Sequence, residues 1–356
     1  MKIFKNWIRL FFVSFIVSMT SIALFNFFVD SAGIFGNKSY LAKVAEELVS
    51  GKMIAGLSDY NERVFQELII KKSKKKNDMI ILGSSRSMMI REKNFKNIKN
   101  FFNHSVSGAT LEDYMAIVDL YENRKSYIPK NIILAIDPWI FNKFNSQNRW
   151  KVLKENYFHF LSKIMKKSIS SKKSFNSSKI KQLINYEYTA SNIAFLKKIF
   201  QQNPYYITKT IDIEDSIKGL DGSMYYPSSK RSPNFKVVKQ RAIQFATNNQ
   251  VVFLERFNNL SHTYKFENFI SYLQESDVNI RFVLFPYHPI SYDLLIKDKR
   301  YAIIEDVELY LKEFAKDNNI EIFGSYNPHK FNFTNRDFMD GMHGLERVTK
   351  KILERN

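Results

Sequence analysis

The sequence contains no cysteine among its 356 residues. This absence excludes disulfide bonds, thiolate metal sites and cysteine nucleophiles. We expect no metal site and no cofactor. The length is ample for one α/β domain of about 250 residues with additions, and no internal repeat is visible.

Acidic residues are scarce relative to basic ones. The chain has 35 Asp and Glu against 54 Lys and Arg, which gives a formal net charge of +19. Such a chain could bind nucleic acid, but its basic residues are scattered and no nucleic-acid-binding motif accompanies them. We therefore expect no nucleic-acid partner and favour anionic envelope polymers or lipid headgroups.

Charged residues are absent from Leu10–Val29, a run of about the length that spans a bilayer core. Because Lys2, Lys5 and Arg9 precede it, residues 1–30 are predicted to form a single-pass membrane anchor with a cytoplasmic N-terminus. The rest of the chain would then be extracytoplasmic. Two alternatives stay open: cleavage near Ser31-Ala32-Gly33, and a buried helix of a soluble domain.

A buried strand and a tight corner are predicted at residues 78–87. Met79–Leu82 is wholly apolar, and Gly83-Ser84-Ser85 follows it directly. This pattern is typical of a parallel strand whose carboxyl end carries the chemistry of an α/β sheet. A serine at such a corner could be a nucleophile, or Ser84 and Ser85 could be only turn and cap residues.

The pair Asp340 and His343, three positions apart near the end of the chain, favours the first alternative. A nucleophilic serine needs a base to take its proton, and that base needs a partner on its other nitrogen. Ser85, His343 and Asp340 would fill these three roles. We predict that the fold brings them within hydrogen-bond distance of one another.

These motifs resemble those of the SGNH (GDSL-like) hydrolase superfamily. Gly83-Ser84-Ser85 is similar to its first block, Asn103–Gly108 to its second, and Asp340–His343 to its last. The third block of the superfamily is usually Gly-x-Asn-Asp. This sequence departs from that pattern, because Ala135-Ile136-Asp137-Pro138-Trp139 stands in its place. The resemblance covers roughly residues 78–142 and 278–356.

The resemblance implies that Ser85 is the nucleophile and that the backbone N–H groups of Ser85 and Gly108 form the oxyanion hole. The asparagine donor of the third block is not identified. The chain is closest in character to membrane-anchored bacterial members that acylate cell-surface polymers, which implies a membrane, a surface glycan or anionic envelope polymer, and a membrane-bound acyl-transfer partner.

Four further residues are candidates for lining a substrate pocket, because they stand at the carboxyl ends of predicted strands. Each could equally be a turn or packing residue, and His288 lacks the Asp-x-x-His context of His343. The candidates are Ser84, Asp137, Trp139 and His288.

The predicted fold is a three-layer α/β/α arrangement around a mostly parallel sheet of SGNH or flavodoxin-like type, after one N-terminal transmembrane helix. Residues 31–77 would connect the anchor to the domain through helical stretches. Residues 78–356 would form the domain, with an insertion at about 143–250 that covers the active-site edge. Further strands are expected at Asn131–Ile136, Ile280–Phe285 and Ile320–Phe323, and helices at Thr110–Tyr121, Ala302–Lys316 and Leu345–Arg355.

Two functions follow from these patterns. The first is a membrane-anchored serine esterase or O-acyltransferase acting on acyl groups, in particular acetyl groups, of a surface polysaccharide or envelope polymer. The second is a catalytically inactive relative that binds or helps assemble a polysaccharide, which the departing third block favours.

Overall fold

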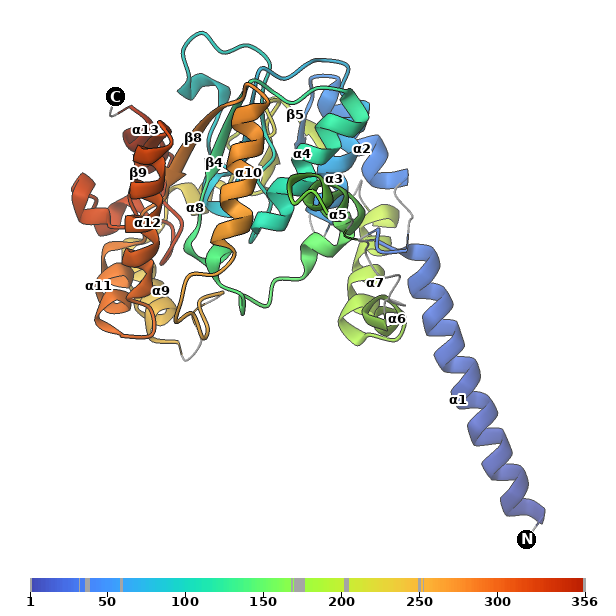
Figure 1. Ribbon diagram of the computed structural model, residues 1–356. Coiled ribbons are helices and arrows are strands. Elements are labelled where there is room, and N and C mark those ends of the chain that lie inside the picture. The colour runs from blue at the N-terminus through green and yellow to red at the C-terminus, as the bar shows by residue number, and fades with distance from the viewer. Residues whose placement is uncertain are drawn as a thin grey trace.

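The computed structural model describes residues 2–31, 33–35, 39–57, 60–167, 169, 177–201, 205–248, 251 and 253–354 (Figure 1). Residues 168, 170–176, 202–204, 249 and 250 of the predicted insertion lie outside the described residues, as do Ala32 of the alternative cleavage site and Arg355 of the predicted last helix. The α-helices are α1 (Lys2–Val29), α2 (Ser39–Val49), α3 (Glu62–Lys72), α4 (Leu111–Lys125), α5 (Lys154–Ile164), α6 (Ser177–Leu183), α7 (Tyr186–Gln201), α8 (Ser228–Arg231), α9 (Phe235–Thr247), α10 (Thr263–Glu275), α11 (Pro289–Lys297), α12 (Ile303–Asp317) and α13 (Glu346–Leu353).

A parallel five-stranded sheet forms the centre of the molecule. The strand order is β3-β2-β4-β8-β9, and all four neighbouring pairs are parallel. The order reverses at β2, so the corners after β2 and β4 flank a topological switch point, where ligands bind in open α/β sheets. The strands are β2 (Met79–Leu82), β3 (Phe101–Asn103), β4 (Asn131–Ala135), β8 (Asn279–Leu284) and β9 (Glu321–Gly324). The bounds of β2, β4, β8 and β9 are close to the predicted ones, whereas the sequence predicted no bounds for β3.

Both faces of this sheet are buried. Ile80, Ile132 and Phe282 point into a large apolar cluster that includes residues of α4, α10 and α12. Their neighbours along the strands point into a second cluster, which includes residues of α9 and α13. Two-sided burial explains why these strands are apolar without alternation.

The predicted start of the helix after the second block is confirmed. Thr110 and Asp113 form a capping box at the beginning of α4. The helix continues past Tyr121 to Lys125, because the chain leaves it only at Ser126, which adopts a left-handed conformation.

A second, antiparallel sheet joins the connecting segment to the insertion. Its order is β5-β1-β6-β7, with β1 (Met53–Ala55) from the connecting segment. The sequence indicated only helical stretches before residue 78, because a three-residue strand leaves no periodic signal. The partners are β5 (Tyr206–Thr208), β6 (Ile217–Lys218) and β7 (Met224–Tyr225).

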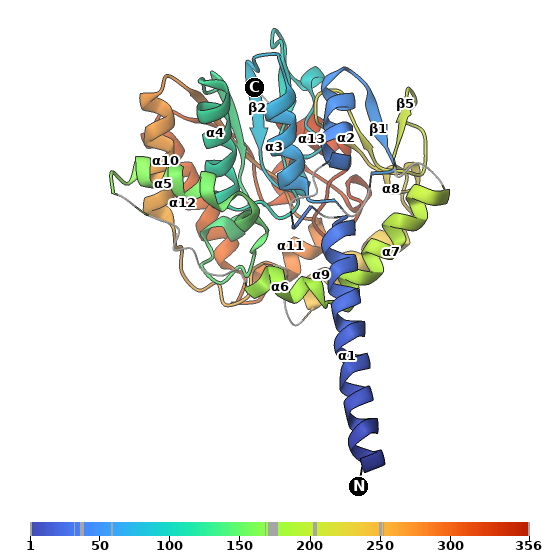
Figure 2. The same cartoon turned by 90° about the vertical axis from the view of Figure 1, so that its right-hand side faces the viewer.

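Helix α1 projects away from the body of the molecule, as both views show (Figures 1 and 2). Among the described residues it contains the segment long and apolar enough to cross a membrane, Phe4–Val29, with a mean hydropathy of 2.0. None of its most apolar 18-residue window is buried inside the structure. This exposure distinguishes α1 from the core helix of a soluble domain.

Candidate active site

Ser85, Asp340 and His343 come together at the carboxyl edge of the main sheet. The Oγ of Ser85 lies 2.9 Å from Nε2 of His343, and Nδ1 of His343 lies 2.9 Å from Oδ2 of Asp340. These are the contacts predicted from the sequence. With the Nδ1 proton directed at Asp340, Nε2 can accept the proton of the Ser85 hydroxyl.

The environment of Asp340 favours its ionised form. Its Oδ1 accepts hydrogen bonds from the backbone N–H groups of Met342 at 2.9 Å and His343 at 2.8 Å. Burial acts to raise the pKa of Asp340, but the charge and hydrogen bonds of His343, with those backbone donors, outweigh it and bring the pKa down to about 2. A carboxylate so held can orient the imidazole and stabilise the imidazolium.

A tight loop from Phe338 to Gly344, here called the histidine loop, sets the positions of Asp340 and His343. Phe338 and Gly344 pair across it, and the N–H of Met339 donates to the carbonyl of His343 at 2.9 Å. A Cβ on Gly341 would lie 2.6 Å from the Cβ of Phe245 on α9. Glycine is therefore required where the loop passes closest to the insertion.

The corner after β2 presents Ser85. A Cβ on Gly83 would lie 2.2 Å from Oγ of Ser87 and 2.7 Å from Cβ of Ala135 on β4, so only glycine fits there. Ser84 is buried, and its Oγ accepts the N–H of Arg86 at 3.2 Å, which caps the short helix Ser85–Ser87. Ser84 is thus a helix-cap residue, which was the alternative interpretation of both serines, whereas the Ser85 side chain points to His343.

Arg86 links four parts of the site, a role that the sequence analysis did not assign. Its Nε donates to the carbonyl of Met342 at 3.1 Å, Nη1 to Oδ1 of Asp137 at 2.9 Å, and Nη2 to the carbonyl of Phe285. Its guanidinium carbon lies 4.3 Å from the centroid of the Tyr287 ring. This buried cation ties the corner after β2 to the ends of β4 and β8 and to the histidine loop.

Asp137 and Trp139 lie in the interior, each 2% exposed. Burial raises the pKa of Asp137, while Arg86 and a hydrogen bond from Ser84 oppose that rise. Trp139 donates from Nε1 to the carbonyl of Ala109 at 2.9 Å and packs on Phe253. Both side chains occupy packing positions beneath the site rather than a substrate surface.

His288 caps α11 instead of facing Ser85. Its Nδ1 accepts the N–H of Ile290 at 3.2 Å, and its ring packs against Phe338. Burial lowers the pKa of His288 to about 4, although the charge of Asp340 acts to raise it. His288 is thus a neutral support beneath the histidine loop.

The predicted oxyanion donors, the N–H groups of Ser85 and Gly108, make no backbone hydrogen bond within the described part of the chain. Gly108 has a φ of +55°, and its carbonyl accepts Nε2 of Gln147 at 3.0 Å. Glu62 holds the preceding residue, since its carboxylate accepts the N–H and the hydroxyl of Ser107 at 2.5 and 2.9 Å.

Two further contacts hold the Gly108 loop beside the serine corner. The N–H of Val106 donates to the carbonyl of Gly83 at 3.0 Å. Arg63 on α3 forms a fully buried ion pair with Asp113, with both N–O distances 2.8 Å, and its guanidinium also donates to the carbonyl of Ser107 at 3.2 Å. Sequence reasoning missed the roles of Glu62 and Arg63 because both belong to the connecting segment.

A cleft of about 650 Å³ opens beside Asp340 and His343. The insertion supplies most of its lining, including the basic side chains Lys230 and Arg241 and the apolar Val237. The hydroxyl of Tyr226, also from the insertion, donates to the backbone carbonyl of Ser85 at 3.2 Å. The insertion therefore does lie over the edge that carries Ser85.

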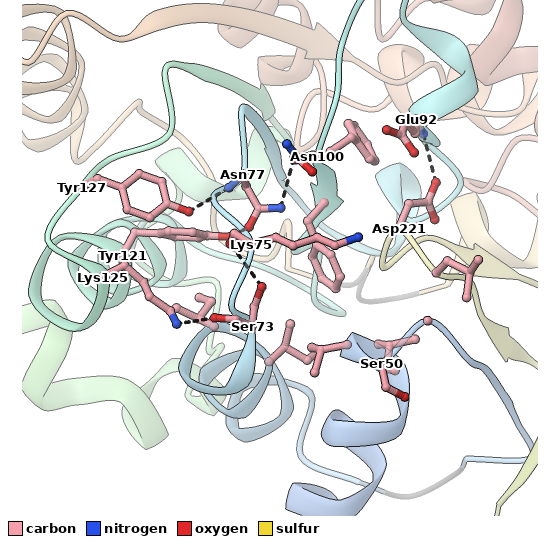
Figure 3. Close-up of a pocket in the computed structure, with 18 residues that line it drawn as sticks. Ser50, Ser73, Lys75, Asn77, Glu92, Asn100, Tyr121, Lys125, Tyr127 and Asp221 are labelled. Carbon is pink, nitrogen blue, oxygen red and sulfur yellow. Dashed lines mark hydrogen bonds between the residues drawn. The ribbon is translucent and has the colours of Figure 1, made fainter.

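A second pocket, of about 380 Å³, lies at the opposite end of β2 and β3 (Figure 3). Polar groups that line it bond to one another: Lys125 to the carbonyl of Ser73, and Asn77 to the carbonyl of Asn100 at 3.1 Å. Ser85, Asp340 and His343 are not among the residues that line this pocket. Among the described residues, no cluster of three or more His, Asp or Glu side chains could hold a metal ion.

No family model matches the chain, and no curated protein was found that is similar to it. The arrangement of its side chains is therefore the basis for assigning a function.

Proposed function

We propose that the protein is a membrane-anchored serine esterase or O-acyltransferase of SGNH type, with a three-layer α/β/α domain outside the cytoplasm. Its substrates are acyl groups, in particular acetyl groups, on a cell-surface polysaccharide or related envelope polymer. The observation that carries this proposal is the continuous hydrogen-bonded chain from Ser85 through His343 to Asp340.

In the first half-reaction Ser85 Oγ attacks the acyl carbonyl while Nε2 of His343 takes the hydroxyl proton. The N–H groups of Ser85 and Gly108 stabilise the negative charge that develops on the carbonyl oxygen. The tetrahedral intermediate then releases the alcohol of the donor, which receives its proton from His343. The acyl group remains on Ser85.

In the second half-reaction an acceptor hydroxyl attacks the acyl-serine while His343 takes its proton; the bond between the acyl carbon and Ser85 Oγ then breaks, and His343 returns the proton to Ser85 Oγ. Water as acceptor completes hydrolysis, and a sugar hydroxyl completes transfer. The basic side chains Lys230 and Arg241 in the cleft suit an anionic acceptor, and a membrane-bound partner would supply the acyl donor.

The alternative is a catalytically inactive protein that binds or helps assemble a polysaccharide. Its support is the third block, where the corner after β4 carries Asp137, paired with Arg86, instead of an asparagine donor. The two proposals differ in whether Ser85 reacts.

A fluorophosphonate probe on the full-length protein in detergent tests this difference. We expect labelling of the unmodified protein and none of Ser85→Ala or His343→Ala. Ser271→Ala on α10, the same substitution at an exposed serine, is the matched control and should label normally. With an acyl-ester substrate, Ser85→Ala and His343→Ala should each lower turnover by about 10⁴–10⁶-fold, as should the double variant, because the triad acts as a unit. Folded protein that does not label would support the binding protein.

A further inference from the structure

The C-terminal end of α1 packs against α6 and α7 of the insertion, and this end of α1 lies beside both helices in both views (Figures 1 and 2). Asn26, near the end of α1, is fully buried. Its Nδ2 donates to the carbonyl of Leu183 at 2.8 Å and to Oγ1 of Thr189 at 2.7 Å, and its Oδ1 accepts Nδ2 of Asn192 at 2.9 Å. An amide in an apolar span needs such partners, because lipid offers none.

The residues that follow α1 are bound to α7 as well. The backbone N–H of Ser31 donates to Oδ1 of Asn192 at 3.0 Å, and the hydroxyl of Tyr188 donates to Oδ1 of Asp30 at 2.7 Å. The end of α1 and the α6–α7 pair thus form one packed unit, in which one face of α7 contacts α1 and the residues that follow it.

Another face of α7 is apolar and uncovered. Tyr186, Ile193 and Phe200 are seven residues apart, which places them along one side of the helix, and they are 85%, 45% and 83% exposed. Exposed apolar patches mark interaction surfaces. We define the α6–α7 patch by these residues with their exposed apolar neighbours Ile180, Ile184 and Ile199.

The patch lies at the level where α1 would leave a bilayer. The hydrocarbon core is about 30 Å thick, which about 20 helical residues span. Counted from Arg9, the last basic residue before the apolar run, this length ends near Val29, next to the contacts of Asn26 and Ser31 with α7. Exposed Lys181 and Lys197 accompany the apolar side chains, as is typical of helices that lie in the headgroup region.

We propose that the α6–α7 patch is seated in the interfacial region of the outer leaflet, so that a spanning helix and an interfacial helix pair together fix the domain on the membrane. This inference rests on the proposed membrane anchorage. Helices α9 and α11 lie at the same end of the body as α6 (Figures 1 and 2). The seating therefore turns the cleft lined by α9 toward the lipid surface, where membrane-bound donors and nascent polymers are found.

The test uses the absence of cysteine, which allows single labelling sites. Val17→Cys in the span, Ile193→Cys in the patch and Leu309→Cys on α12 each receive an environment-sensitive fluorophore; Leu309, 57% exposed, is the matched control for Ile193. The full-length variants are placed one copy per nanodisc of phosphatidylcholine and phosphatidylglycerol. Lipids that carry a nitroxide either at the headgroup or deep in the acyl chain then quench the fluorescence of probes at that depth. Iodide quenches the fluorescence of probes that are exposed to water.

We expect deep nitroxide to quench the Val17 probe, headgroup nitroxide to quench the Ile193 probe, and iodide alone to quench the Leu309 probe. If the Ile193 probe behaves like the Leu309 probe while the Val17 probe is deep, the interfacial seating is overturned and the anchorage stands. If the Val17 probe is not quenched by deep nitroxide, the anchorage itself fails and the seating fails with it. Protection of Ile193 only in discs that hold two copies would assign the patch to self-association and also overturn the proposal.

Discussion

At the scale of single residues, Arg86 holds the surroundings of the proposed triad through hydrogen bonds to Met342, beside His343, and to Asp137 and Phe285. Lysine at this position would keep a charge for Asp137 but could not also reach the carbonyls of Met342 and Phe285, because it lacks the guanidinium fork. We expect Arg86→Lys to lower the rate of fluorophosphonate labelling by about 10²-fold, since small displacements of catalytic groups cost this much.

Arg91→Lys is the matched control for that measurement. Arg91 is also a buried arginine that donates to two backbone carbonyls, those of Met89 and Met224. Its ion pair is with Glu346 at the start of α13, at 3.2 Å, and within the described residues it has no hydrogen bond to the loop from Phe338 to Gly344. Its replacement should lower stability while leaving the labelling rate of the folded protein near that of the unmodified one. Equal losses of labelling in both variants would show that Arg86 acts only through general stability.

Two buried histidines make stability depend on pH. Burial lowers the pKa of His104 to about 3 and that of His288 to about 4, from 6.5 in both cases. Their contribution to stability is fully present above pH 6.5. As the pH falls below 6.5, the unfolded chain binds protons that the folded chain does not. Each histidine therefore lowers the free energy of unfolding by up to about 1.4 kcal/mol per pH unit.

His288→Asn isolates one of these contributions. Asparagine can still accept the N–H of Ile290 and cap α11, but it does not titrate. Urea unfolding of the full-length protein in detergent, followed from pH 7 to pH 4.5, should show a shallower loss of stability in the variant. An unchanged slope would mean that His288 is protonated in the folded protein.

At the scale of elements, α3 holds the loop that contains Ser107 and Gly108 through charges that are buried. The side chains of Arg63 and Asp113 are 2% and 0% exposed. Removing one member of a buried pair costs about 3–5 kcal/mol, whereas replacing both by apolar residues costs much less. We therefore expect Arg63→Met to lower the free energy of unfolding strongly in urea unfolding. Arg63→Met with Asp113→Leu should recover part of the loss, because Asp113→Leu also removes the capping box of α4. A double variant as unstable as the single one would contradict this.

Four strands of the main sheet, β2, β4, β8 and β9, could be predicted from sequence, because each is a short and mostly apolar run with Gly, Asp or Pro at its end or within two residues of it. Strand β3, Phe101–Asn103, has no such ending and was not predicted. The contacts among Ser85, His343 and Asp340 could be predicted because the proposed chemistry needs three residue types in known roles. The parts that escaped prediction depend on distant contacts: Arg86 donates to Met342, 256 residues away. Likewise β1 is defined only by pairing with β5 and β6 of the insertion. No local period reports such pairings.

At the scale of the whole molecule, the apolar helix and the large body on its C-terminal side set the expected orientation. Phe4–Val29 has 26 residues, a length of about 39 Å at 1.5 Å per residue, which exceeds a bilayer core of about 30 Å. Lys5 and Arg9 at its beginning favour the cytoplasmic side for the N-terminus. The cleft, Ser85 and the α6–α7 patch would then all lie outside the cytoplasm.

Reporter fusions to the C-terminus test this orientation in a bacterial host. Alkaline phosphatase folds only outside the reducing cytoplasm, so its fusion should be active, whereas a cytoplasm-dependent fluorescent protein exported through the general secretion route should be dark. Replacing Lys2, Lys5 and Arg9 by glutamine removes the charges that retain the N-terminus inside, and should lower phosphatase activity per fusion protein. A bright fluorescent fusion with an inactive phosphatase fusion would reverse the orientation, and a serine enzyme of the envelope would then be excluded, because the Ser85–His343–Asp340 chain would face the cytoplasm.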